Sequence, residues 1–331
     1  MTDQPHGFTT LIHWLKTHPI WLCLGVLVAS SALFLTLGVS DWGFALPLRG
    51  TKLLALMTVG FAIGTSTLLF QTLTHNPILT PALLGFDALY VLIKSLMVFF
   101  LGVASLSSIP RLAQFALEVG LMLGLSLMLF RLLFTKHSQD LTRLILVGVV
   151  FGVLFRSLSS LVARMISPDE FVTIQSASYA QFNTINTQVL GISMLICAAT
   201  AVVMYRLRHQ CDILLLGKYP AINLGINYQK LTLLLLGLIA LLVAVSTAMV
   251  GPVTFFGLLV CALTNQLSSS MHHGKRLALV SVLAMSCLVF GQLLFEYVLK
   301  MAGVLEVVIE LFGGVMFLWL VFRQYNKKGS V

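Results

Sequence analysis

The chain has 331 residues, of which 58% are hydrophobic and 9% are charged, and its mean hydropathy is +0.99. A soluble domain carries about 25% charged residues, so this composition excludes a soluble globular fold and indicates that lipid surrounds much of the chain. The net charge of +9 does not predict a nucleic-acid partner, because the basic residues lie singly at the ends of apolar runs, where they act as topology signals.

Apolar runs of membrane-spanning length recur along the whole chain. A transmembrane helix needs roughly 20 apolar residues, and about ten runs approach or meet that length: 19–39, 53–73, 82–102, 110–134, 141–165, 189–205, 231–250, 255–267, 276–299 and 307–322. They do not alternate polar and apolar residues, which excludes a transmembrane β-barrel. The sequence therefore predicts an all-α integral membrane protein of about ten helices, with one domain over residues 1–331 and a first helix that is not cleaved as a signal peptide.

Polar links and basic residues set the expected topology. Polar links are expected at 40–52, between the first two spans, and at 167–186, on the opposite side from the cytoplasm. With both termini in the cytoplasm, most of the 20 Lys and Arg residues lie at cytoplasmic ends, as the positive-inside rule requires. This orientation needs an even number of crossings.

The sequence lacks the residue patterns that several kinds of enzyme chemistry require. No G-x-x-x-x-G-K-[ST] motif occurs, so the chain is not expected to hydrolyse ATP. The five cysteines have no metal-ligand spacing, and we expect neither a metal nor a cofactor. His272 and His273 form the only histidine pair, which we expect in a solvated loop with no acid nearby.

Charged residues inside the apolar runs bear on how transport is driven. An ion-coupled carrier usually places carboxylates at the bilayer midplane. We expect Glu118, Glu296 and Glu310 toward the outer ends of their spans and Asp87 at the inner start of the third span, which argues against such a carrier. Arg156 lies inside the fifth run, where a charge is costly, so it either lines a passage, forms a structural salt bridge or snorkels to the membrane surface.

Three pairs of glycines lie four residues apart within the expected spans: Gly60 and Gly64, Gly120 and Gly124, and Gly148 and Gly152. Small residues at this spacing let the backbones of neighbouring helices approach closely. The pairs therefore predict tight packing of the second, fourth and fifth helices.

A polar insert that can form a short helix, at about 211–228, separates the sixth and seventh spans. Basic residues flank it, which places it in the cytoplasm. A short ordered segment at that position predicts contact with a soluble partner. The segment's central residues are Leu216, Gly217, Lys218, Tyr219, Pro220, Ala221, Ile222, Asn223, Leu224 and Gly225.

Four segments of the chain resemble motifs of one transporter family, the iron–siderophore and cobalamin ABC importer permeases. Residues 71–85 resemble its Q-x-x-x-x-N-P-x-x-x-P-x-x-L-G run, and residues 250–258 are similar to its G-P-x-x-F-x-G-L signature. Residues 224–226 look like the end of its cytoplasmic coupling segment, and residues 312–317 resemble its final helix. The family's R-x-P-R motif is replaced by Arg49-Gly50-Thr51-Lys52, and its P-H pair by Cys261-Ala262. These variants resemble the subgroup that imports catecholate or related siderophores.

The resemblance implies a transporter complex of several subunits in the bacterial inner membrane. It implies ten helices per permease, a second permease that we expect to be a different chain, two cytoplasmic ABC ATPases and a periplasmic siderophore-binding protein. It assigns docking of the binding protein to Arg49 and Lys52, and also to Lys300. Residues 216–225 become the contact with the ATPases.

The expected function is ATP-driven import of a ferric siderophore by alternating access. The second, fifth and eighth helices are expected to shape a wide, weakly binding passage with few buried charges. The residues expected along this pathway are Gln71, Asn76, Arg156, Phe255 and Phe256. The alternatives are a cobalamin or haem permease of the same family, an ion-coupled secondary carrier, and an exporter or membrane scaffold.

Overall fold

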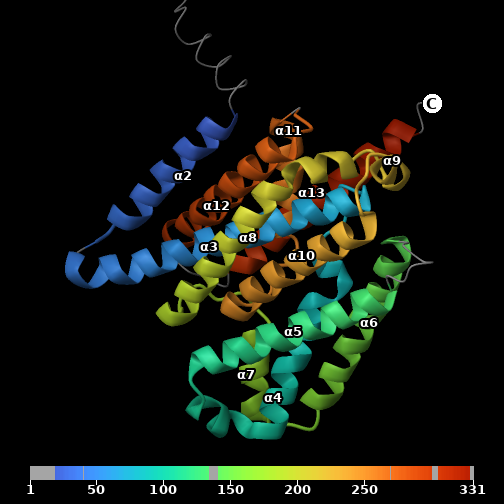
Figure 1. Ribbon diagram of the computed structural model, residues 1–331. Helices are drawn as coiled ribbons and strands as arrows, with labels where there is room; N and C mark the ends of the chain where they lie inside the picture. The colour runs from blue at the N-terminus through green and yellow to red at the C-terminus, as the bar shows by residue number, and fades with distance from the viewer. Residues whose placement is uncertain (1–18, 40, 134–140, 269, 300–304, 329–331) are drawn as a thin grey trace, which may run out of the picture.

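A computed structural model describes residues 19–39, 41–133, 141–268, 270–299 and 305–328. Within these ranges every regular element is helical, with twelve α-helices and one 3-10 turn (Figure 1). They are α2 (Pro19–Thr36), α3 (Trp42–Thr74), η1 (Pro81–Leu84), α4 (Phe86–Ser108), α5 (Arg111–Leu133), α6 (Leu141–Ala163), α7 (Pro168–Ala177), α8 (Thr187–Leu214), α9 (Lys218–Asn223), α10 (Tyr228–Val250), α11 (Phe256–Leu267), α12 (His273–Tyr297) and α13 (Leu305–Lys328).

The predicted all-helical membrane fold is confirmed. Among the described residues, eight helices are long and apolar enough to cross a membrane: α2, α3, α4, α5, α6, α8, α10 and α12. The predicted eighth span corresponds to α11, which has 12 residues and is about 18 Å long. It is therefore too short to cross alone, and the apolar stretch Val307–Met316 of α13 is short as well.

Helix α3 lies in the middle of the bundle and packs against α8, α10, α11 and α12 (Figure 1). The helices α4 to α7 form a second group beside it, joined through contacts of α5 with α10. The bundle has two ends. We call the end with α9, the last turns of α3 and α8 and the first turn of α12 the α9 end. The opposite end, with α7 and the first turns of α3, α5 and α8, is the α7 end.

The expected polar link at 40–52 is wrong, because α3 already begins at Trp42. Asp41 caps this helix by accepting a hydrogen bond from the N–H of Gly43 at 2.9 Å, which satisfies a backbone donor that the helix leaves unpaired. The hydroxyl of Thr51 donates to the carbonyl of Pro47. The polar residues of this stretch therefore form the first turns of a 33-residue helix.

Close helix packing is confirmed for two of the three glycine pairs. A Cβ on Gly60 would lie 2.9 Å from the backbone nitrogen of Met285 in α12, and one on Gly148 would lie 2.7 Å from the side chain of Leu84. By contrast, a Cβ on Gly120 or Gly124 would meet no described atom within 4 Å. The expected tight packing of a neighbouring helix on Gly120 and Gly124 is therefore wrong among the described residues.

Helix α4 begins deep in the bundle rather than at one of its ends. Gly85, just before it, has a φ of +83° and packs on Gly152, whose Cα would lie 2.7 Å from a Cβ at Gly85. Gly152 is at the middle of the 23-residue α6. Asp87 is thus level with the centre of α6, and its expected position at the inner end of a span is wrong, because η1 leads the chain back into the bundle before α4 starts.

Candidate functional site

A cavity of about 800 Å³ opens at the α7 end. This volume is within the range of about 300–1,000 Å³ that binds whole small molecules. Its walls come from the start of α3, the segment before α8 and the end of α12. The lining residues are Pro47, Leu48, Arg49, Thr51, Lys52, Phe182, Asn183, Thr184, Ile185, Asn186, Thr187 and Glu296.

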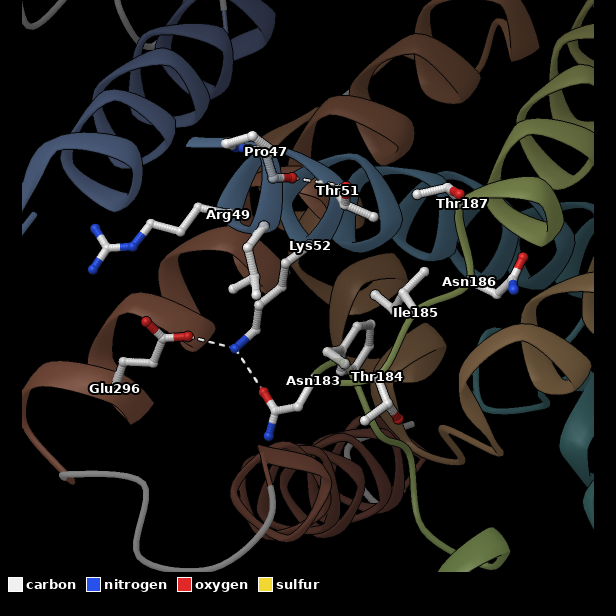
Figure 2. A pocket seen from close by; sticks show the side chains of 12 residues that line it. Pro47, Arg49, Thr51, Lys52, Asn183, Thr184, Ile185, Asn186, Thr187 and Glu296 are labelled. Atoms are coloured by element: carbon white, nitrogen blue, oxygen red, sulfur yellow. Dashed lines mark hydrogen bonds and ion pairs between the residues drawn. The ribbon is translucent and has the colours of Figure 1, made fainter. Parts of the chain in front are cut away.

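A buried ion pair closes one wall of this cavity. The ammonium of Lys52 lies 2.5 Å from Oε1 of Glu296 and donates to Oδ1 of Asn183 at 2.8 Å (Figure 2). Glu296 also accepts a hydrogen bond from Gln292 at 2.8 Å. A buried charge is costly unless it is paired and hydrogen-bonded, and this cluster supplies both conditions. It ties α3 to α12 and to the segment before α8.

Arg49 has a structural role at the same end. Its Nη1 donates to the carbonyl oxygens of Phe34 at 3.0 Å and Leu37 at 2.6 Å, which lie in the last turn of α2 and just after it. A cation at a helix C-terminus is favoured by the helix dipole. Figure 2 shows its guanidinium turned away from Lys52, so the two residues act on different neighbours.

The structure separates the residues that the sequence assigned to binding-protein docking. Lys52 is only 6% exposed and already has two acceptors, so it lines the cavity wall and is not available to a protein that docks from outside. Arg49 is half-buried and lies at the rim. Lys300 lies outside the described residues.

A second group of charges is buried at the α7 end, contrary to the expectation of few buried charges. Lys94 lies 2.5 Å from Oε1 of Glu118, and Arg111 lies 3.4 Å from the same oxygen. Glu118 is fully buried. The sequence did not show this cluster, because its members are brought together from α4 and α5 by the packing of the second helix group.

The expected pathway residues do not gather in one place. Gln71 is buried and donates to the carbonyl of Pro77 at 2.8 Å, while Asn76 accepts from the N–H of Ile78 at 3.0 Å. These two residues shape the turn after α3. Phe256 is 1% exposed and belongs to the core at the start of α11. None of the three lines the large cavity.

A fourth pathway candidate, Phe255, follows Thr254, which lies beside two carboxylates, Asp87 and Glu310. Phe255 precedes α11, and a Cβ on Gly313 would lie 2.6 Å from the Cβ of Phe255. The neighbouring Thr254 donates to Glu310 at 3.1 Å and lines, with Asp87, a cavity of about 20 Å³, which is large enough for about one water molecule.

Arg156 is exposed on α6. It forms no ion pair within 4 Å among the described residues, and its charge acts on Asp87 only from a longer distance. A tight structural salt bridge with another described residue is therefore not its role.

The insert at about 211–228 contains a short helix, as expected. Helix α9 starts after Gly217, whose φ of +99° suits glycine, and only Ala221 of its side chains is buried. Tyr219 is 76% exposed, and Leu216 and Leu224 are each 60% exposed. Clustered exposed apolar side chains of this kind are typical of a protein–protein contact.

A buried histidine lies where the start of α12 meets the last turns of α8 and α3. His273 is 0% exposed, its Nδ1 lies 2.9 Å from Asp212, and its Nε2 lies 2.8 Å from Oγ1 of Thr72. The expectation of a solvated His272–His273 loop without an acid is wrong, because His273 is buried against Asp212 and the exposed His272 lies 3.8 Å from the same carboxylate. The reason is that α8 continues past the expected end at Tyr205 and carries Asp212 to the start of α12.

Comparison with known proteins identifies the transporter family of this chain. Residues 20–323 match the FecCD transport family. The chain belongs to the FecCD transport family. This FecCD permease is therefore a multi-pass subunit of a bacterial ABC importer and is not itself an ATPase, as its sequence indicated.

Two curated relatives cover most of the FecCD permease. It is 38% identical over 305 residues to the petrobactin import system permease protein YclO of Bacillus subtilis, which covers 92% of this chain and 97% of the relative. It is 31% identical over 276 residues to the petrobactin import system permease protein FatC of Bacillus anthracis, covering 83% and 78%.

A solved structure has the same fold. The inward-facing conformation of a putative metal-chelate type ABC transporter superposes with a TM-score of 0.81 and covers 93% of the FecCD permease and 99% of that chain, at 19% sequence identity. At this identity the likeness supports the fold alone.

Proposed function

We propose that this FecCD permease carries a ferric siderophore of the catecholate class, and that petrobactin is the first candidate. The observation that carries the proposal is the 38% identity to a petrobactin permease over 92% of the chain. The cavity at the α7 end supports it, because a volume of about 800 Å³ suits a bulky chelate.

The proposed orientation has both termini in the cytoplasm. The basic residues at the α9 end support it, so the α7 end faces outward. The permease then crosses the membrane about ten times, with α11 and α13 as shortened crossings beside the eight long helices. Residues 1–331 form one permease domain in this proposal.

The proposed transport cycle uses both ends of the bundle. A loaded siderophore-binding protein docks at the α7 end, over the large cavity, with Arg49 and Lys300 at the contact. One ABC ATPase binds the exposed side chains of α9 in this permease, and the second ATPase binds the second permease chain. Their closure moves α8 and α10, which flank α9 in the chain, and the passage alternates between outward and inward access.

The proposed assembly contains a second, different permease chain. The replacement of the family's R-x-P-R motif by residues 49–52 supports this, as does the open face of Gly120 and Gly124, where a Cβ would meet no atom of the described residues within 4 Å. Such small-residue faces allow close approach of another helix. Affinity purification of the tagged permease should recover two permease chains of different mass together with the ATPase.

The substrate proposal is tested by reconstitution of that purified assembly in lipid vesicles. Added binding protein and internal ATP should produce accumulation of ⁵⁵Fe-labelled ferric petrobactin, whereas the permease by itself should accumulate none. Uptake of haem or cobalamin in place of the ferric siderophore would contradict the substrate assignment, and uptake that a protonophore stops without any ATPase would contradict the mechanism.

A further inference from the structure

We propose that a small basic pocket beneath α7 binds one anionic arm of the ferric chelate, through Lys94 and Arg111. This inference rests on the proposed import of a ferric siderophore. The pocket has a volume of about 240 Å³, which is below the range of about 300–1,000 Å³ for whole ligands. It therefore has room for a single ring or carboxylate, not for a complete chelate.

The lining of the pocket is polar and carries positive charge. Lys94 and Tyr90 come from α4 and Arg111 from the start of α5, while α7 and the segment after it supply hydroxyl and amide groups. The acidic residues of α7, Asp169 and Glu170, are not among the lining residues. The full lining is Tyr90, Lys94, Arg111, Thr173, Ser176, Ala177, Tyr179, Gln181, Thr184, Met249 and Val250.

The charge balance of this cluster favours an anion. Glu118 lies behind the pocket and pairs with both Lys94 and Arg111, so two cations face one carboxylate and a net charge of +1 remains. Lys94 is more than nine-tenths buried, with 8% of its surface exposed. A partly uncompensated charge at such depth is costly, and an anionic ligand in the pocket would compensate it.

Hydrogen-bond donors are also left over. The Lys94 ammonium has three N–H groups and one acceptor among the described residues, Oε1 of Glu118 at 2.5 Å. Arg111 donates to Glu118, to Gln114 and to the carbonyl of Ala248 at distances of 3.2–3.4 Å, which leave these bonds weak, and it also interacts with the Tyr90 hydroxyl. Catecholate or carboxylate oxygens would give these donors stronger, charge-assisted partners.

The pocket is positioned next to the large cavity. Thr184 lines both of them, so a chelate that fills the large cavity can extend one arm toward Lys94. The two cavities differ in chemistry. In the large one the ammonium of Lys52 is already bound by Glu296 and Asn183. In the small one, among the described residues, Lys94 has a single hydrogen-bond acceptor and the charges of Lys94, Arg111 and Glu118 leave a net positive charge.

The test compares two small ferric chelates of different charge, and the Arg111 variants described below separate the effect of charge from differences in ring and size. The iron complex of Tiron, a catechol disulfonate, is strongly anionic, and ferric acetohydroxamate is uncharged. We expect the purified transporter in lipid nanodiscs to bind ⁵⁵Fe-labelled ferric Tiron about tenfold more tightly than the uncharged chelate in equilibrium dialysis, the change expected for one hydrogen bond from a charged donor. Equal affinity for the two chelates would overturn the proposal.

Variants of Arg111 keep the test independent of folding. Its side chain is 35% exposed, so Arg111→Gln should fold, and it removes the excess charge. This variant should bind both chelates equally, while Arg111→Lys should retain the preference. An unchanged preference in Arg111→Gln would overturn the assignment, and so would displacement of ferric Tiron by an equal concentration of sulfate, because the pocket would then be a site for inorganic anions.

The outcome is separable from that of the proposed function. If the transporter accumulates ferric petrobactin but shows no charge preference in dialysis, only the pocket assignment fails. If the wild type shows the preference and Arg111→Gln lacks it, but no ferric siderophore is accumulated, the pocket stands and the substrate proposal fails. Unchanged docking of the empty binding protein to Arg111→Gln is also expected; loss of docking would assign Arg111 to that contact and overturn the inference.

Discussion

The Nδ1 atom of His273 lies 2.9 Å from Oδ1 of Asp212, and this contact joins the first turn of α12 to the last turn of α8. The backbone N–H of His273 donates to the same oxygen at 2.6 Å, so the carboxylate also caps the N-terminus of α12. With Thr72 on the other side of the imidazole, α3, α8 and α12 meet at one buried side chain at the α9 end.

Replacement of this cap should destabilise the permease. We expect Asp212→Ala to lower the free energy of unfolding by about 1–2 kcal/mol, because α12 loses a cap and His273 loses its acceptor. Thermal unfolding in nanodiscs measures this change. His272→Ala is the control, because the exposed His272 side chain lies 3.8 Å from the same carboxylate and should contribute little there. An equal loss of stability in both variants would show that the cap and the buried His273 contact contribute nothing beyond this exposed ion pair.

The Lys52–Glu296 pair should behave as a coupled unit. Lys52→Met leaves a buried carboxylate without its cation and should lower the free energy of unfolding by about 3–5 kcal/mol. The double variant Lys52→Met/Glu296→Gln should recover much of that loss, because no buried charge remains unpaired. A double-mutant cycle from unfolding curves gives the coupling energy. Additive effects of the two substitutions would contradict the pairing seen in the structure.

Two glycine-to-alanine substitutions should have opposite effects. At Gly60 the added methyl group would lie 2.9 Å from the backbone of Met285, so Gly60→Ala should lower the free energy of unfolding by about 1–3 kcal/mol through overpacking. At Gly120 no described atom is in the way, and the same change should be neutral or stabilise the helix by up to about 1 kcal/mol. Unfolding of the isolated permease measures both, and a stabilised Gly60→Ala would be inconsistent with close packing of α3 on α12.

A charged substitution on α9 should uncouple transport. Leu224 is 60% exposed, so Leu224→Asp should leave the unfolding temperature unchanged, while uptake of the ferric siderophore should fall at least about tenfold, since a buried charge at the ATPase contact is costly. Leu224→Met keeps an apolar side chain and should transport normally. Docking of the loaded binding protein should be the same in all three proteins. Normal uptake by Leu224→Asp would remove α9 from the coupling role.

Local sequence patterns predicted the helices well and their ends less well. Apolar runs identified the long spans, since a bilayer demands continuous apolar length, and the separate runs 231–250 and 255–267 correspond to α10 and α11. The patterns failed where polar residues continue a helix. Residues 42–52 belong to α3, and α8 extends to Leu214, because their side chains find partners that no local pattern shows.

The charged groups of the site were the least predictable part. Lys52 is 244 residues from its partner Glu296, and Asp212 is 61 residues from His273. A sequence shows each group singly, so it indicated an exposed docking lysine and a solvated histidine. The buried Lys94–Glu118 pair was missed for the same reason, although two opposite charges inside neighbouring apolar runs were a signal that could have suggested it.

The sequence alone determined that this chain is a helical membrane permease that depends on a separate ATPase subunit. Composition, span length and the absence of a nucleotide motif can be read directly from the order of the residues. Only the tertiary structure decided which charges are buried together, where α4 begins, and which cavities open at the α7 end. Those features depend on helices that meet across long stretches of sequence, and the energy of a charge depends on its neighbours in space.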